Sequence, residues 1–232
     1  MKRTLATLVV MGLSVSAFAG GADDPLNYKV MIDKLETRIT DGPNPLVLEA
    51  DAWVGHDLDK FWLKTDVERV DGQAEEAELQ LLYSRAIAPF WDFQAGWRRN
   101  IKPQPHRDYL ALGFKGLVPY LFEVDGGVYL GESGQVSARL DAAYEYLFTQ
   151  QLVLSPEISM NLYGKDDAEA GIGSGLSDMA LGLRLRYAIR REFSPYIGVN
   201  WKKQFGQTAD FTKAEGGDAS DTQFVVGIRA WF

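Results

Sequence analysis

Apolar and polar side chains alternate with a period of two along most of the chain after residue 28. The clearest alternating runs cover residues 48–54, 60–68, 76–84, 91–98, 136–146, 178–190 and 223–232. A period of two is typical of β-strands, because successive side chains point to opposite faces of a sheet. Cutting the chain at its turn signals gives about 12 strands of roughly ten residues, the length and even count of an outer-membrane barrel. A soluble β-sandwich would show the same alternation.

The lengths of the connections favour the barrel over the sandwich. Tight turns are expected near residues 56–59, 89–90, 119, 149–151 and 190–192. The opposite strand ends carry long connections rich in Gly, Asp and Pro, at 102–107, 164–175 and 207–220. Outer-membrane barrels have short periplasmic turns and longer extracellular loops. We therefore predict an all-β, transmembrane, antiparallel up-and-down β-barrel, with its short turns in the periplasm.

Aromatic residues and the C-terminus agree with this prediction. Several aromatic side chains fall toward predicted strand ends on the apolar parity, where membrane-interface girdles belong: Trp91, Trp97, Tyr120, Phe148, Tyr187 and Trp201. The chain ends in an alternating strand over residues 226–232 with a terminal phenylalanine, Phe232. This ending resembles the signal by which the outer-membrane assembly machinery recognises its substrates.

The first residues have the features of an export signal. Lys2 and Arg3 precede an apolar run over residues 5–15, and residues 17–19 give the small-x-small pattern of a signal-peptidase site. The run is shorter than the roughly 20 residues that a membrane-spanning helix needs. The predicted organisation is a cleaved signal peptide (1–19), a short periplasmic segment (20–27) and an outer-membrane barrel (28–232).

Charge and composition narrow the function. Without Lys2 and Arg3, the 24 basic residues become 22 against 32 acidic ones, so the exported chain has a net charge of −10. This balance argues against nucleic acid as a partner, because phosphates require a basic surface. The chain has no cysteine, which rules out disulfides and thiolate metal sites.

The charged parity of each strand must face the lumen, because the other face meets lipid. We expect the inward-facing carboxylates to attract cations. These candidates are Glu49, Asp51, Asp66, Glu68, Glu76, Glu78, Glu123, Asp125, Asp141, Glu145, Glu157 and Asp178. By strand direction, seven of them fall in the outer half, namely Glu49, Asp51, Asp66, Glu68, Glu76, Glu78 and Asp178. The bases Lys60, Arg184, Arg186, Arg190 and Arg229 fall in the inner half, so we expect an acidic mouth above a basic or mixed floor.

The hairpin that turns near residues 71–73 concentrates these carboxylates. Its register sets Glu68 opposite or diagonal to Glu76 and Glu78, with Asp66 beside them. Directly opposed like charges destabilise a strand pair unless a cation or a basic side chain compensates them. Two interpretations stay open: a wall that attracts cations, or a hydrated surface partly neutralised by luminal lysines.

Candidates for tighter metal binding are weak. His56 falls in a predicted periplasmic turn and His106 in an outer loop, where histidines are more often exposed than ligating. Met31 and Asp33 share a face of the first strand, with Glu36 further along, but the parity of that strand stays open. Tight copper(I) binding would require Met or Cys ligands, whereas carboxylates suit hard or labile cations.

Catalysis is not expected. A His-dependent outer-membrane hydrolase needs its histidine held beside a nucleophile on a rigid wall. Neither histidine lies in the middle of a predicted strand, and no serine is placed beside either one. We therefore predict no catalytic residues and no organic cofactor.

Several stretches together resemble the copper resistance protein B (CopB) family of outer-membrane proteins. They are residues 31–36, 52–55, 61–65, 163–167, 171–178, 184–187 and 190–199. The match covers essentially the whole exported chain, and the block from 163 to 199 is long and ungapped enough to be specific.

The resemblance implies a barrel in the outer membrane of a Gram-negative bacterium that serves copper tolerance, either by giving copper ions a route across the membrane or by sequestering them there. It also implies outer-membrane lipid around the barrel and periplasmic copper-handling proteins as candidate partners. This chain lacks the Met- and His-rich tract that often lies between signal and barrel in relatives, which shifts weight to the acidic lumen. The alternative is a closed structural barrel without transport, filled by its own side chains.

Overall fold

The computed structural model describes residues 24–118 and 122–232. The predicted signal peptide, residues 20–23 of the predicted periplasmic segment, the predicted turn near residue 119 and Tyr120 therefore lie outside the described residues. The strands are β1 (Asn27–Ile39), β2 (Leu46–Gly55), β3 (Asp59–Val70), β4 (Gln73–Ala88), β5 (Trp91–Lys102), β6 (Arg107–Val118), β7 (Phe122–Gly131), β8 (Val136–Ala143), β9 (Tyr146–Leu147), β10 (Leu152–Tyr163), β11 (Gly175–Tyr187), β12 (Phe193–Gln204) and β13 (Ser220–Trp231). A 3-10 turn, η1 (Glu132–Gly134), and one α-helix, α1 (Gly206–Ala214), lie in connections.

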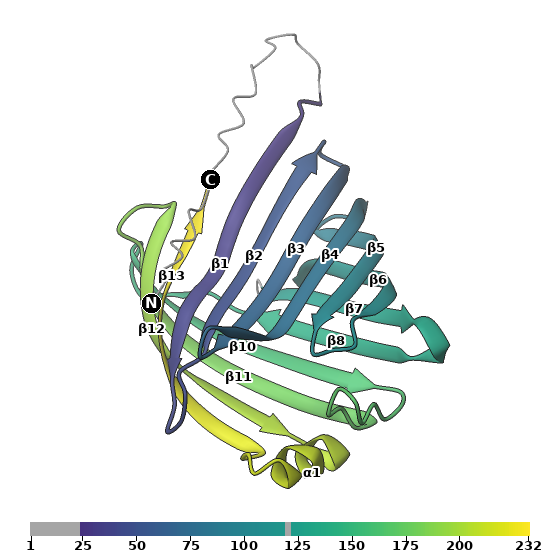
Figure 1. The fold of residues 1–232 in the computed structure, drawn as a ribbon. Helices are drawn as coiled ribbons and strands as arrows, with labels where there is room; N and C mark the ends of the chain where they lie inside the picture. Colours follow the sequence, from purple (N-terminus) through teal and green to yellow (C-terminus); the bar gives the residue numbers. More distant parts are fainter. Residues whose placement is uncertain (1–23, 119–121) are drawn as a thin grey trace, which may run out of the picture.

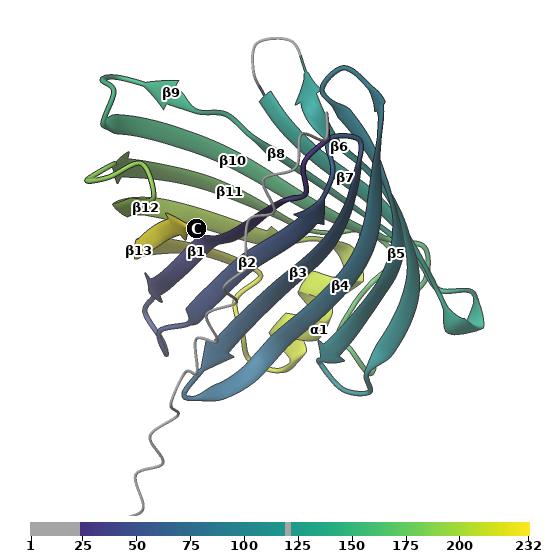
Figure 2. The ribbon, with the colours of Figure 1, turned by 90° about the horizontal axis from the view of Figure 1, so that it is seen from above.

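The strands follow one another around a closed wall (Figures 1 and 2). Each long strand is antiparallel to the next, from β1 to β8 and then from β10 to β13, and β13 pairs back with β1. The two-residue β9 pairs with β10 beyond the end of β8, so it continues the place of β8 in the wall. The predicted up-and-down antiparallel β-barrel is therefore confirmed, with twelve long strands.

The alternation seen in the sequence becomes an apolar exterior and a charged interior. On β3, Phe61 and Leu63 are 64% and 43% exposed, whereas the side chains of Lys60 and Lys64 on the other parity are 19% and 18% exposed. A continuous apolar exterior is unfavourable in water and favourable in lipid. The barrel therefore spans a membrane and encloses its charged side chains in the lumen.

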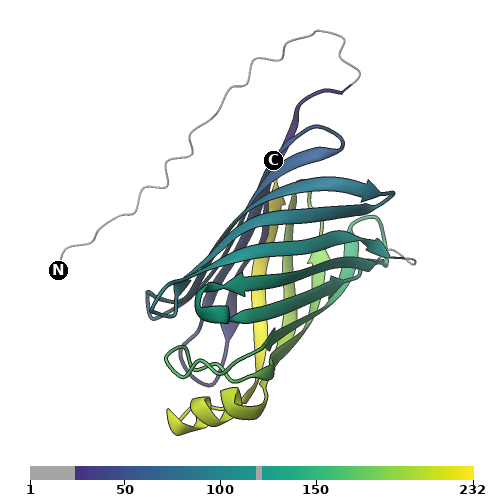
Figure 3. The ribbon, with the colours of Figure 1, turned by 90° about the vertical axis from the view of Figure 1, so that its right-hand side faces the viewer.

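The two ends of the barrel differ. The terminal end, where β1 begins and β13 ends, has tight connections at residues 56–58, 89–90 and 188–192, as predicted. The opposite end, here called the α1 end, carries the longer connections at 164–174 and 205–219 (Figure 3). The third long connection expected there is wrong, since only residues 103–106 separate β5 from β6. The α1 end also has one two-residue hairpin, in which Asp71 and Gly72 have φ values of 50° and 80°. Turns with two positive φ values match the twist of the paired strands.

The helix α1 was not expected from the alternation. It forms within the longest connection and is placed by Thr208, whose hydroxyl accepts a hydrogen bond from the backbone N of Gly173 at 2.8 Å and lies 2.9 Å from the hydroxyl of Ser177. The helix therefore packs onto the start of β11. No helix among the described residues is long and apolar enough to cross a membrane.

Exposed aromatic residues gather at the terminal end. Tyr28, Phe61, Phe90, Phe148 and Tyr187 are all at least 50% exposed and lie at or near strand ends there. Phe148 and Tyr187 are therefore exposed at or near strand ends, where the sequence predicts a membrane-interface girdle. Such side chains combine an apolar body with a polar or polarisable rim that suits the headgroup region.

The open question of the parity of β1 is resolved by a β-bulge. The register shifts after Ile32 relative to both neighbouring strands. Because of the inserted residue, Met31 and Asp33 face the lumen in the first half of the strand, and Lys34 and Glu36 face it in the second half. A strictly alternating strand could not place all four side chains inside.

The orientation of the barrel is testable by cysteine labelling, because the chain contains no cysteine. Ser174 and Lys213 are exposed at the α1 end, and Asp57 is exposed in a turn at the terminal end. On intact cells, Ser174→Cys and Lys213→Cys should react with a maleimide too large to pass porins. Asp57→Cys should react only after the outer membrane is permeabilised. The reverse pattern would invert the predicted orientation.

Candidate functional site

The predicted cation-attracting carboxylates all lie on the lumen parity, but most have basic partners. Seven of the twelve lie within 4.0 Å of a basic group. These are Glu49 with Lys34, Glu68 with Arg38, Glu76 with Lys202, Glu78 with Arg98 and Arg139, Asp125 with Lys64 and Lys115, Glu145 with Arg186 and Arg229, and Glu157 with Lys34 and Arg184. The lumen is therefore a network of ion pairs.

Several of these pairs cross the lumen. Arg139 of β8 reaches Glu78 of β4 at 3.1 Å, and Lys64 of β3 reaches Asp125 of β7 at 2.7 Å. The partners of each pair are 61 residues apart in the chain and belong to strands that are not adjacent in the wall. These pairs narrow the lumen.

The expected register of the acidic hairpin is confirmed, but the expected separation of acidic and basic groups into two halves of the lumen is wrong. Glu68 pairs with Glu76 and Asp66 with Glu78 across β3 and β4. Sequence reasoning placed the bases in the other half of the lumen. Instead, basic groups of the same half approach these carboxylates: Arg38 lies 3.5 Å from Glu68, Lys202 3.5 Å from Glu76, and Arg98 2.7 Å from Glu78. The repulsion between opposed carboxylates is therefore compensated.

The most deeply buried charge in the lumen is Glu36, which is 1% exposed. Its carboxylate accepts two hydrogen bonds from Arg184 at 2.8 and 2.9 Å, one from Arg38 at 2.9 Å and one from the hydroxyl of Tyr196 at 2.9 Å. A side chain at Gly227 would not fit, since a Cβ there would lie 2.7 Å from both Glu36 and Tyr196. The glycine thus makes room for the network. Both oxygens of Glu36 are already occupied by protein donors.

The other weak metal candidates are scattered. Asp33 lies 2.9 Å from Arg229, and the sulfur of Met31 lies 3.8 Å from the same guanidinium. His56 is half-exposed in the β2–β3 turn, where its Nδ1 lies 3.0 Å from a backbone oxygen, and His106 is exposed in the β5–β6 connection. Within residues 24–118 and 122–232, no group of three or more His, Asp or Glu residues is arranged to hold a metal ion.

The remaining five predicted carboxylates have no basic group within 4.0 Å among the described residues. They are Asp51, Asp66, Glu123, Asp141 and Asp178, and we call them the free carboxylates. Asp178 stands near the start of β11 at the α1 end, and Glu123 near the start of β7 at the terminal end. The other three lie between them on β2, β3 and β8. They follow the lumen from one end to the other.

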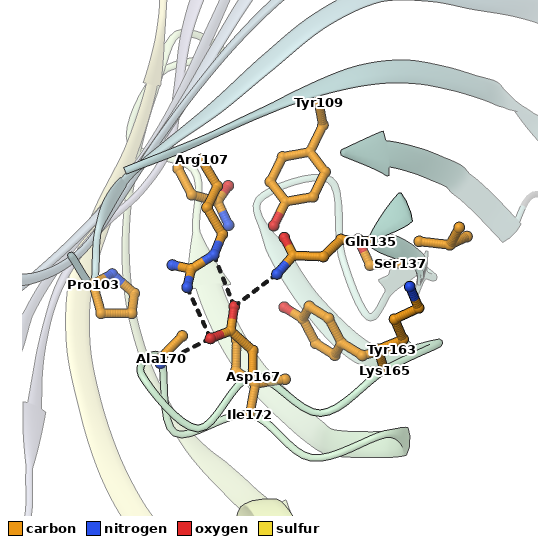
Figure 4. A pocket seen from close by; sticks show the side chains of 12 residues that line it. Pro103, Arg107, Tyr109, Gln135, Ser137, Tyr163, Lys165, Asp167, Ala170 and Ile172 are labelled. Carbon is orange, nitrogen blue, oxygen red and sulfur yellow. Dashed lines mark hydrogen bonds and ion pairs between the residues drawn. The ribbon is translucent and has the colours of Figure 1, made fainter. Parts of the chain in front are cut away.

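A loop folds over the α1 end of the lumen (Figure 4). Asp167 of the β10–β11 connection lies 2.7 Å from the Nε of Arg107 on β6, and Gln135 donates a hydrogen bond to it at 3.1 Å. Both charged side chains are largely buried, at 13% and 16% exposure. In the same loop, a hydrogen bond of 2.6 Å from the backbone N of Ser174 lowers the pKa of Asp166. The loop lines a pocket together with Tyr109 and Tyr163.

Comparison of the sequence with known proteins decides the family. The sequence profile of the copper resistance protein B precursor (CopB) family matches residues 26–232. The chain is 42% identical to copper resistance protein B of Escherichia coli over 210 residues, which cover 90% of this chain and 71% of the relative. The chain belongs to the CopB family. It is also 39% identical to the CopB homolog of Pseudomonas syringae pv. tomato (strain ATCC BAA-871 / DC3000) over the same shares of the two chains.

Solved structures support the fold. The NanC porin superimposes with a TM-score of 0.56 at 10% identity, covering 88% of this chain and 99% of that one. The KdgM porin superimposes with a TM-score of 0.52 at 12% identity over the same shares. At this identity the likeness shows the barrel fold alone. The CopB family and the porin-like barrel together place the protein in the outer membrane of a Gram-negative bacterium.

The Glu36 network should contribute strongly to stability. Glu36→Gln leaves two buried guanidinium groups with a neutral partner, and we expect it to lower the free energy of unfolding by about 3 kcal/mol. Glu75→Gln, on the exposed parity of β4, should change it by less than about 0.5 kcal/mol. Urea titration of the barrel in lipid vesicles measures both. Equal stability of the two variants would show that the network is dispensable.

The two histidines should contribute little to metal binding, because neither lies on the lumen wall. We expect His56→Ala/His106→Ala to bind copper(II) in detergent solution as the parent protein does. Isothermal titration calorimetry with copper(II) alone provides the comparison. Loss of most of the binding in the double variant would mean that the histidines, and not the carboxylates, hold the metal.

Proposed function

We propose that this CopB barrel gives copper ions and other cations a narrow route across the outer membrane, along the carboxylates of its lumen. The observation that carries the proposal is the set of free carboxylates. Asp178 and Glu123 stand near the two ends of the lumen, with Asp51, Asp66 and Asp141 between them. A cation entering at either end meets a carboxylate that has no basic group within 4.0 Å in the described part of the chain.

The chemistry of these groups suits passage rather than storage. Single carboxylate oxygens attract cations but do not select copper, which favours Met, Cys and His ligands when it is bound tightly. Carboxylates on separate strands bind weakly, so an ion can leave as readily as it enters. Membership of the CopB family supports copper as the transported ion, and the lumen carboxylates attract cations without selecting among them. Neither requires a catalytic step.

A closed structural barrel is the second candidate, and one observation favours it. Ion pairs such as Arg139 with Glu78 and Lys64 with Asp125 cross the lumen and occupy part of its section. Small barrels can be filled completely by their own side chains. The two candidates differ in whether the purified protein conducts ions.

Neutralising the free carboxylates tests the route. Asp51→Asn/Asp66→Asn/Asp141→Asn removes three lumen charges, and since none of them pairs with a base, no buried cation loses its partner. We expect copper uptake into proteoliposomes to fall several-fold, most strongly at low salt, where screening is weakest. A metal-sensitive dye inside the vesicles reports the uptake.

A matched control changes the same number of charges elsewhere. Asp41, Asp57 and Asp71 are exposed in connections outside the lumen, and Asp41→Asn/Asp57→Asn/Asp71→Asn should leave uptake unchanged. If the lumen variant takes up copper as fast as this control, the free carboxylates are not a route and the structural barrel is favoured.

A further inference from the structure

The bulge in β1 gives the lumen a lysine that regular alternation would have turned outward. Met31 and Asp33 already face inward, so the next residue, Lys34, would point to lipid in an uninterrupted strand. The register shift after Ile32 returns Lys34 to the lumen. Bulges are frequent where a strand must redirect a side chain next to a functional site. The side chain of Lys34 is 19% exposed.

The ammonium group of Lys34 bridges two walls of the barrel. Its Nζ lies 2.9 Å from a carboxylate oxygen of Glu49 on β2 and 2.9 Å from one of Glu157 on β10. β1 and β10 are separated in the wall by β11, β12 and β13. Glu157 is also held by Arg184 at 3.0 Å, which connects the bridge to the Glu36 network. The bridge is therefore anchored to the Glu36 network on its Glu157 side.

The bridge stands beside the free carboxylates. Glu49 is the register partner of Asp66 on β3, and Asp51 follows it two residues later on the same face of β2. Neither Asp51 nor Asp66 has a basic group within 4.0 Å among the described residues. A cation that moves along this face from Asp66 to Asp51 therefore passes Glu49, whose carboxylate binds the ammonium of Lys34.

We propose that Lys34 is a tethered counter-cation that determines which cations pass the lumen. This inference rests on the proposed route. The ammonium occupies the place between Glu49 and Glu157 that a passing cation would take, and its tether gives it a high effective concentration there. A free monovalent ion brings the same charge without the tether and competes poorly. A divalent ion is attracted about twice as strongly by the same carboxylates and can displace the ammonium.

Removing the ammonium tests the proposal. Lys34→Met keeps an unbranched side chain and removes the charge. In planar bilayers with KCl alone, we expect the single-channel conductance to rise several-fold. With calcium chloride on one side, the preference for the divalent ion should fall. Lys34→Arg keeps a cation at the bridge and should retain the low conductance of the parent protein.

The matched control is Lys60→Met, which removes another lumen ammonium. Lys60 lies near the terminal end, 4.0 Å from Asp92, and bridges no distant strands. The conductance of the Lys60→Met variant should stay close to that of the parent protein. Should Lys34→Met fail to insert, Lys34→Gln/Glu49→Gln removes both charges of the pair. This double variant should show the same rise in conductance over the parent protein that is expected of Lys34→Met. No rise in either neutral variant, or an equal rise in Lys60→Met, would overturn the role of Lys34.

The failure of this inference is distinguishable from failure of the route. If neutralising Asp51, Asp66 and Asp141 leaves copper uptake intact, the route itself is wrong. If that change lowers uptake while Lys34→Met conducts like the parent protein, the route stands and only the role of Lys34 is wrong.

Discussion

Charge enclosed in a narrow lumen must be compensated within a few ångströms, and this constraint shapes the interior of the barrel. Removing a carboxylate and a guanidinium from water costs several kcal/mol for each ion, which only close pairing with additional hydrogen bonds offsets. Glu36 meets the condition with two arginines and a tyrosine hydroxyl. Gly227 and the β-bulge in β1 both accommodate this pairing. The backbone of the barrel wall is thus adapted to the ion pairs that it encloses.

Some carboxylates of the lumen are not compensated by a nearby base in the described part of the chain. Of the twelve lumen carboxylates predicted from the sequence, seven are compensated by nearby bases, and five have no base within 4.0 Å among the described residues. In the proposed route, the paired groups hold neighbouring strands together and the free carboxylates provide the negative potential that attracts mobile cations. The proposed route thus separates the carboxylates that stabilise the barrel from those that attract the passing cation.

Most of the fold could be predicted from the sequence, because alternation with a period of two reports directly which face of each strand meets lipid. The opposition of Glu68 and Glu76 was also expected from the sequence, although the structure reaches it through a two-residue turn followed by a register shift between Glu68 and Arg69. The charge balance was not. Arg139 meets Glu78 across the lumen from 61 residues away, and such a contact depends on strand number and stagger, which no local pattern encodes.

The bulge in β1 and the helix α1 were missed for a similar reason. A bulge is one extra residue in a strand, and it leaves the alternation ambiguous where Ile32 is followed by Asp33 and Lys34. The helix is short and is fixed by tertiary hydrogen bonds of Thr208. The candidate carboxylates were therefore found from the sequence, but their separation into paired and free groups required the closed barrel.

The central claim is that the lumen conducts cations along its free carboxylates. The most direct test is the reversal potential of the purified protein in a planar bilayer under a KCl gradient. A cation route gives measurable channels whose reversal potential is shifted toward the equilibrium potential of potassium. The shift should increase as the salt concentration is lowered. A bilayer that stays silent with correctly inserted protein, or a reversal potential on the chloride side, would contradict it.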